Sequence, residues 1–306
     1  MRFLRMRKKK VGSVLTLLIF LLPWIIGFSV FLVIPMSIAL YYSFTNYDVF
    51  SPTSWVGIDN YLKLPKDSIY IKAVYNTVYF ISIAIPLNLF FSLFLALLLN
   101  TGVRGYKVFR TIYFIPFIMP LVAIGMVWRW IFNDTYGILN YLLSAVGIDG
   151  PAWLASTQWV KPAIILVNLF LIGQQMIIFL AGLQNMPEIL YDAAKVDGAN
   201  WMQKLKHITL PLLSPVILFN AVILAIVSLQ VFTLPYTLSW VATSAGQGQG
   251  GPAYSSTFYV MYLYTRAFEN LQLGRASAMA WVFFVITVCF TYLLFKLTRR
   301  WIFYRV

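Results

Sequence analysis

The side chains of this chain that could do chemistry are few, and most of them are neutral. Cys289 is the single cysteine and His207 the single histidine among 306 residues. A lone cysteine forms no internal disulfide or Cys-x-x-Cys redox pair, and a lone histidine lacks the second ligand of a zinc site. We therefore expect no haem or iron–sulfur centre, no metal site and no catalytic residue in this chain.

Neutral amides stand inside long apolar stretches. Such groups must find hydrogen-bond partners within the protein if their surroundings are hydrocarbon. Two interpretations stay open for each of them: a hydrogen bond that holds helices together, or a place on the lining of a path for a neutral polyol or sugar. The candidates for the path are Asn168, Gln174, Gln175, Asn220 and Gln230.

The composition indicates the elements that must position these amides. Hydrophobic residues make up 61% of the chain, charged residues 10%, and the mean hydropathy is +0.80. Soluble proteins carry about 25% charged residues, so we predict an all-α integral membrane protein. Six apolar runs are long enough to span a bilayer as helices, at residues 14–42, 73–99, 111–132, 162–183, 212–240 and 276–297.

The net charge of +14 is explained by topology. Basic residues concentrate in 1–10, 101–110, 187–207 and from 296 onward, which lie on one side if six spans alternate. The positive-inside rule places that side, and both termini, in the cytoplasm. The basic residues therefore do not indicate a nucleic-acid partner. We expect a basic tail, first transmembrane helix and external loop at 1–72, a transmembrane core at 73–297 and a basic cytoplasmic tail at 298–306.

Charges within the predicted spans are scarce. No Asp or Glu lies in the central part of any of them, which argues against coupling to protons or sodium ions. Arg129 stands between Trp128 and Trp130, a setting that favours cation–π anchoring at the membrane surface. The Gly-rich segment 244–252 predicts a flexible loop. It lacks the Gly-Lys-Ser/Thr of a phosphate-binding loop, so we expect no nucleotide site.

The loop between the fourth and fifth spans, residues 186–211 (loop 186–211), has the pattern of two short helices. Pro187 suits a helix start, and Glu188 complements the helix dipole there. Gly198 can end the helix in a left-handed conformation, and a second helix is expected at about 200–206, stopping near Pro211. Such a pair can dock into a groove on another protein, although an amphipathic connector has the same pattern.

The spacing of this loop resembles a known motif. Asp192-Ala193-Ala194 with Gly198, followed by Ile208-x-Leu210-Pro211, resembles the EAA loop of binding-protein-dependent ABC importer permeases, whose fold is MetI-like. Asp192 stands where the family has Glu. Three further segments resemble the carbohydrate-uptake branch, of the maltose and glycerol-3-phosphate type, and its maltose-F-like partner: Tyr136-Gly-Ile-Leu-Asn140, Trp153-Leu154 and Leu273-Gly-Arg-Ala-Ser-Ala278.

The resemblance implies that loop 186–211 docks on a separate ATPase. The implied coupling residues are Glu188, Asp192, Ala193, Ala194, Asp197, Gly198, Ile208, Leu210 and Pro211. It also implies a second permease subunit in a heterodimer, an extracytoplasmic solute-binding protein, and ATP and Mg²⁺ bound by the ATPase, with no cofactor in this chain.

The expected protein is a multi-pass permease in a bacterial or archaeal cell membrane. It would be a transport subunit and not an enzyme, importing a sugar, an oligosaccharide or a sugar derivative by alternating access. The alternative from another class is a self-sufficient channel or secondary transporter for a neutral polar solute.

Overall fold

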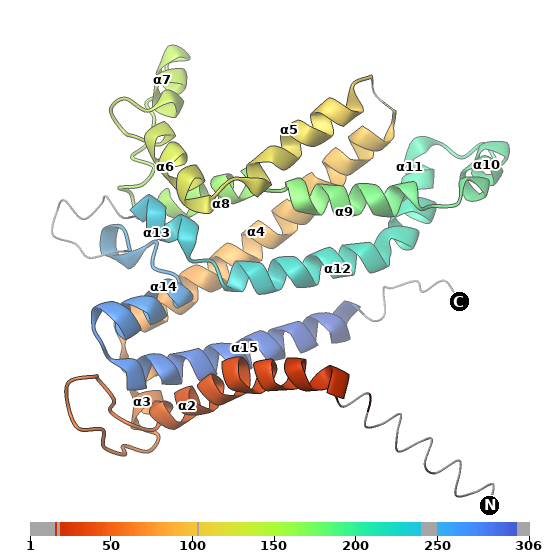
Figure 1. Cartoon of the computed structure of the whole chain (residues 1–306). Coiled ribbons are helices and arrows are strands. Elements are labelled where there is room, and N and C mark those ends of the chain that lie inside the picture. Colours follow the sequence, from red (N-terminus) through yellow and green to blue (C-terminus); the bar gives the residue numbers. More distant parts are fainter. Residues whose placement is uncertain (1–15, 17–18, 103, 240–249, 299–306) are drawn as a thin grey trace, which may run out of the picture. The chain divides into compact units, whose positions relative to one another are not determined.

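A computed structural model of the chain describes residue 16 and residues 19–102, 104–239 and 250–298 (Figure 1). Most of the predicted loop 244–252 and the basic ends of the chain lie outside these residues. Within the described part the secondary structure is helical, apart from an isolated bridge between Thr45 and Trp55. The chain divides into two units, residues 1–64 with 265–282 and residues 65–264 with 283–306.

The second unit is built around one long helix. α4 (Ser68–Asn100) packs against several α-helices, namely α5 (Tyr106–Ile118), α8 (Val160–Phe170), α9 (Gly173–Gln184), α12 (Leu210–Leu229) and α14 (Tyr259–Tyr264). Figure 1 shows α9 and α12 running beside it. The Asp67 side chain begins α4 by accepting from the backbone amides of Ile69 and Tyr70, as an N-cap residue does.

The remaining elements of this unit are short. α6 (Leu121–Ile131) packs against α13 (Thr233–Ser239), and α7 (Ile138–Ala145) follows α6. α10 (Glu188–Val196), α11 (Trp201–Lys204) and the π-helical turn η3 (Leu205–Thr209) make up loop 186–211. The short 3-10 helix η5 (Pro252–Tyr254) leads to α14.

Two apolar clusters hold this unit together. One surrounds Phe80 of α4, with Ile164 of α8 and Phe258 among its fully buried members. The other joins Ala96 of α4 to Phe179 of α9 and Leu213 of α12, all fully buried. The second cluster lies at the C-terminal end of α4. It packs α9 and α12, the helices before and after loop 186–211, against α4.

The first unit contains η1 (Ser29–Val33), α2 (Ile34–Ser43), α3 (Asp59–Lys63), η6 (Thr265–Glu269) and the first part of α15 (Leu273–Thr298). The Asn60 amide donates to the carbonyl oxygens of Ser43 and Thr45 at 2.9 and 2.7 Å. In the same unit Lys63 Nζ lies 2.5 Å from Asp59 Oδ2.

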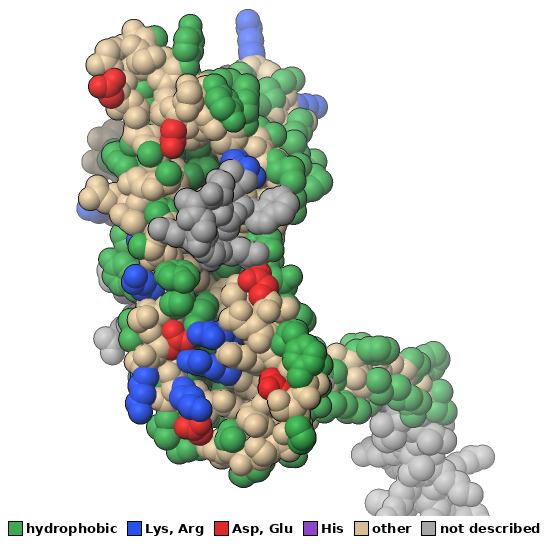
Figure 2. Space-filling view, turned by 90° about the vertical axis from the view of Figure 1, so that its left-hand side faces the viewer, with side chains coloured by type: hydrophobic (Ala, Val, Ile, Leu, Met, Phe, Trp, Pro, Cys, Tyr) green, Lys and Arg blue, Asp and Glu red, His purple; other side chains and the backbone are tan. Residues whose placement is uncertain are grey.

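Figure 2 shows one face of the molecule, on which acidic and basic side chains are interspersed.

The described helices agree with the six predicted spans once bends are allowed. Four are long and apolar enough to cross a membrane: Ile19–Ser43, Ser68–Asn100, Trp201–Leu229 and Leu273–Lys296. Two further runs are bent pairs, α5 with α6 at 100° and α8 with α9 at 45°. The count reaches six if each pair is one span.

The bend between α5 and α6 has a local cause. The predicted run 111–132 is broken at Pro120, and the preceding residue, Met119, is extended with ψ 147°. A proline ring disfavours helical geometry at the residue before it and removes a backbone donor. A continuous apolar run therefore does not form a straight helix here.

We predict that Gly274→Ala destabilises the first unit. The Gly274 amide donates to Tyr47 O at 2.8 Å, and a Cβ at this position would collide with the carbonyl oxygen of Thr45. Overpacking of this kind costs about 1–3 kcal/mol. Thermal unfolding of the purified protein measures the loss, with Gly27→Ala as the control because a Cβ there meets no atom within 4 Å. Equal unfolding temperatures for the two variants would contradict the close approach.

Candidate functional site

Loop 186–211 begins with an exposed, charge-paired helix. Pro187 is the N-cap of α10 and not its first helical residue as predicted, so the helix begins one residue later, at Glu188. Lys195 Nζ is 2.7 Å from Asp192 Oδ1, and both side chains are about two-thirds exposed, at 66% and 65%. The hydrogen bond that Lys195 donates to Asp192 raises the pKa of Lys195. An exposed pair of this kind contributes little to stability, so both charges are available to a partner.

The end of α10 is the predicted left-handed turn. Gly198 has φ +73°, and the amide of Ala199 donates to Ala194 O at 2.8 Å. The next helix starts at once, because Asn200 and Gln203 form a reciprocal capping box. The chain therefore reverses direction within a few residues, and only a residue without a Cβ adopts the Gly198 conformation freely.

The predicted stop near Pro211 is wrong. α11, η3 and α12 form one continuous helix from Trp201 to Leu229. Pro211 lies at the start of α12, directly after the π-helical turn, where a wider turn accommodates the missing backbone donor. The second half of loop 186–211, from Trp201 on, is thus an extension of the fifth span, and a displacement of α11 acts on α12 without a joint between them.

A tyrosine ties the two short helices together. The Tyr191 hydroxyl lies 2.9 Å from Thr209 Oγ1 and 3.1 Å from Met186 Sδ. Thr209 is buried, and Ala194 is buried on the same helix as Tyr191, whereas Ala193 is exposed. Of the two alanines, only Ala194 therefore packs against the rest of the protein. The last three coupling residues that the resemblance implies, Ile208, Leu210 and Pro211, are half-buried.

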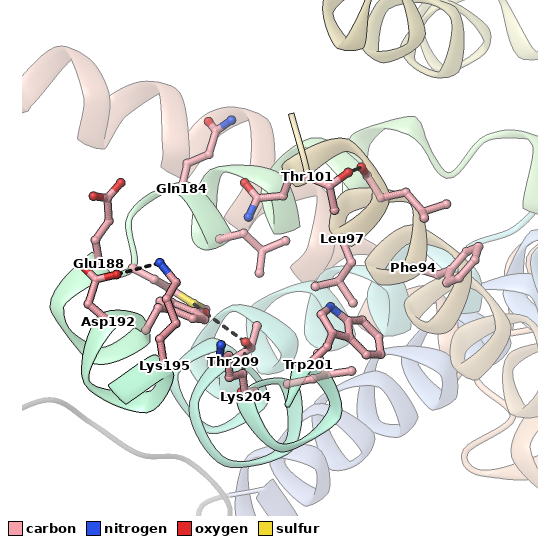
Figure 3. A pocket seen from close by; sticks show the side chains of 16 residues that line it. Phe94, Leu97, Thr101, Gln184, Glu188, Asp192, Lys195, Trp201, Lys204 and Thr209 are labelled. Carbon is pink, nitrogen blue, oxygen red and sulfur yellow. Dashed lines mark hydrogen bonds and ion pairs between the residues drawn. The ribbon is translucent and has the colours of Figure 1, made fainter. Parts of the chain in front are cut away.

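A cavity of about 810 Å³ separates the loop from the spans above it. Figure 3 shows Glu188, Asp192 and Lys195 on one side, and Phe94, Leu97 and Thr101 at the end of α4 on the other. The loop is joined to the fifth span by the continuous helix Trp201–Leu229, and Tyr191 ties α10 to Thr209 of that helix. Space of this size permits the loop to shift against the end of α4.

The outer surface of the loop is apolar although it lies outside the spans. Ile189 is 75% exposed and Val196 89%. Met202 is 59% exposed. Trp201 is 62% exposed, but it lines the cavity of Figure 3. Exposed apolar side chains close together mark protein or membrane contact sites, and the two charges of Asp192 and Lys195 beside them suit a protein groove.

The five path candidates are not gathered in the cavity of Figure 3, and their environments differ. Asn168 Oδ1 accepts from Asn88 Nδ2 at 2.7 Å, which is the helix-linking role. Gln175 is 7% exposed, and Asn220 is fully buried with no hydrogen-bond partner for either amide atom. Gln174 is half-buried, and Gln230 is exposed at the end of α12.

Among the described residues, no cation–π contact is found for Arg129, where the sequence predicted one. Lys161 makes such contacts, and the sequence did not predict them. Within the described residues, cation–π contacts join Lys161 to Tyr75 and Tyr79. The signal was a lone lysine beside an apolar run with tyrosines four residues apart in another span. Only the fold brings these two segments together.

A bundle of apolar, partly broken helices with an exposed two-helix loop is typical of the membrane component of a transporter. The family model of the binding-protein-dependent transport system inner membrane component matches residues 88–303, and the chain belongs to this family. Members are multi-pass transport components and not enzymes. Family membership also favours the importer over a self-sufficient channel or secondary transporter.

Individual relatives cover nearly the whole chain. A probable ABC transporter permease protein, YesP of Bacillus subtilis, is 40% identical and covers 93% of this chain and 91% of its own length. The sulfoquinovosyl glycerol permease SmoG of Agrobacterium fabrum is 34% identical, with coverage of 94% and 92%. The trehalose/maltose permease MalF of Thermococcus litoralis is 30% identical, with coverage of 97% and 96%.

The fold also matches a solved structure. A bacterial ABC transporter that imports the acidic polysaccharide alginate contains a chain with TM-score 0.77 and 24% identity, covering 95% of this chain and 98% of the other. At this identity the match establishes the fold, which is the MetI-like permease fold that the resemblance implied.

We predict that Gly198→Val impairs transport. An L-residue in the left-handed region costs roughly 1–2 kcal/mol, and a β-branched side chain resists it further, so the reversal between α10 and α11 should be disturbed. Sugar-stimulated ATP hydrolysis and uptake by the reconstituted importer measure the effect.

The matched control for Gly198→Val is Gly57→Val. Gly57 also has a positive φ, +60°, and a Cβ there would meet no atom within 4 Å, but it lies far along the chain from loop 186–211. The control should lose stability without losing coupling of ATP hydrolysis to uptake. Normal uptake by Gly198→Val would remove this turn from the coupling pathway.

Proposed function

We propose that this chain is a permease subunit of an ATP-driven importer for a sugar, an oligosaccharide or a sugar derivative. The observation that carries the proposal is the exposed apolar surface of loop 186–211, joined without a break to the fifth span. The names of the relatives support the solute class, since they include trehalose/maltose and sulfoquinovosyl glycerol transport systems.

In this proposal the importer has four kinds of protein component. A second permease pairs with this chain in a heterodimer, and ATPase subunits bind ATP and Mg²⁺. An extracytoplasmic binding protein delivers the solute, as a structure of the alginate transporter with its periplasmic protein supports. The complex lies in the cell membrane of a bacterium or archaeon, with loop 186–211 and both termini in the cytoplasm.

The proposed coupling runs through the loop. Ile189 and Val196 enter a groove of the ATPase, and closure of the ATPase shifts α10 and α11. The Tyr191 contacts and the continuous helix pass this shift to α12. The charges of Glu188, Asp192 and Asp197 lie on the same loop and suit basic residues of a partner.

The solute path is proposed to open between states. Gln175 and Asn220 are buried here, and Asn220 has an amide without partners. An unpartnered buried amide costs about 1–3 kcal/mol. Exposure of Asn220 to a hydrated path in another state would recover that cost, which favours a path beside α12.

The path assignment predicts that Gln175→Leu lowers sugar uptake while the complex still assembles. The change removes the amide but keeps the side-chain volume close to the original, so packing should survive. Gln158→Leu, at an exposed position outside the helices, is the control. Uptake into proteoliposomes and co-purification of the ATPase are measured together, and loss of the complex would instead assign Gln175 to helix packing.

The proposed function as a whole is tested by the same reconstitution. We expect uptake of a sugar only when ATP, the ATPase and the binding protein are present. Uptake by this chain alone in liposomes without ATP would contradict the proposal.

A further inference from the structure

Lys161 lies at the start of α8 among aromatic and amide groups of α4. Its Nζ is 5.6 Å from the centroid of the Tyr75 ring, 5.4 Å from that of Tyr79 and 3.4 Å from Asn76 Oδ1. Lys161 is half-buried, whereas Tyr75 is 61% exposed. The ammonium group is therefore held in place on one side and reachable from the side of Tyr75.

The charge of Lys161 is not matched by a carboxylate. All nine acidic residues of the chain lie in its described part, and none of them forms an ion pair with Lys161. A cation–π contact is worth about 0.5–2 kcal/mol, and the half-buried ammonium group has lost part of its hydration. Two ring faces and one long amide contact leave this cation undercompensated.

The group has donors to spare. An ammonium carries three N–H donors, and the contact with Asn76 Oδ1 uses one of them at the long distance of 3.4 Å. Charge-assisted bonds to anionic oxygens are the strongest use of the others. The exposed Tyr75 ring beside them offers a flat, amphipathic face. A cation next to an exposed ring matches an anionic group attached to a sugar ring.

The position of Lys161 is at the opposite end of α4 from the cavity of Figure 3. Asn76 lies near the start of α4, and Asn100, its last residue, lines that cavity. Asn76 also donates to Tyr254 O and Thr257 O at 2.9 and 2.8 Å, which holds the segment after the Gly-rich loop. If loop 186–211 faces the ATPase, Lys161 faces the side from which the solute arrives.

We propose that Lys161 and Tyr75 form a subsite for an anionic group, namely a carboxylate, sulfonate or phosphate, on the imported sugar. This inference rests on the proposed function and narrows its solute to an acidic sugar or sugar derivative. A lipid headgroup offers the same anionic oxygens, so the experiment must separate a lipid from a solute.

The test is binding of trigalacturonate, and of its neutral methyl ester, to the assembled importer in nanodiscs. The binding protein is left out, and weak binding is followed by saturation-transfer difference NMR. The wild type should prefer the acid over the ester. Lys161→Met should weaken binding of the acid at least about tenfold and leave the ester unaffected. Lys161→Arg should keep binding of the acid, and Lys66→Met, at another exposed lysine, should leave it unchanged.

Two results would overturn the subsite. One is equal binding of acid and ester by the wild type, which needs no variant to fold. The other is a Lys161→Met effect that appears only in nanodiscs containing phosphatidylglycerol, and not in phosphatidylcholine alone, because the anion would then be a lipid. Failure of the proposed function is a separate result, since uptake could be absent while the acid still binds in a Lys161-dependent way.

Discussion

Polar groups inside a bundle of apolar helices must find their hydrogen-bond partners within the protein. Two side-chain amides of α4, Asn88 and Asn76, do so at different levels along the helix. Asn88 is 3% exposed and bonds Asn168 of α8 at 2.7 Å. Asn76 is 2% exposed and bonds two carbonyl groups in the segment around η5. Because hydrocarbon offers no replacement partners, these bonds fix how the neighbours of α4 lie against it.

The packed helices around α4 form a fixed core next to loop 186–211. The apolar cluster around Ala96 and Phe179 is close-packed at one end of α4, and the cavity of about 810 Å³ lies beyond it. The loop continues into the core through the helix that runs past Pro211, and Tyr191 ties α10 to Thr209 of that helix. A rigid core, a space and a continuous helix are the parts that a mechanical coupling between two proteins requires.

The sequence predicted the features that depend on local pattern. Apolar run length located the spans, and the left-handed turn at Gly198 was confirmed because such a turn is a local property. The predicted helix end at Pro211 was wrong, because a proline can also occupy the first turn of a helix, and the sequence does not show the π-helical turn before it. The bend at Pro120 was not predicted, because it lies inside a continuous apolar run and hydropathy does not report backbone geometry.

The site was harder to predict than the fold because its contacts join distant segments. Lys161 and Tyr75 are far apart in the chain, and hydropathy places Arg129 and Lys161 in the same class although only Lys161 meets ring faces within the described residues. Similarly, Asn168 and Asn220 are both amides in apolar runs. The fold alone separates the bonded amide from the unpartnered one.

The central claim, that loop 186–211 docks on an ATPase, is tested most directly by site-specific cross-linking. Cys289 is the single cysteine, so Cys289→Ser provides a background into which Val196→Cys, at an 89% exposed position, is introduced. We predict that a short thiol cross-linker joins Val196→Cys to the co-purified ATPase, with a yield that changes on addition of ATP. Tyr136→Cys, at a 67% exposed position near α7, should give no such product. Cross-linking from Tyr136→Cys but not from Val196→Cys would contradict the account.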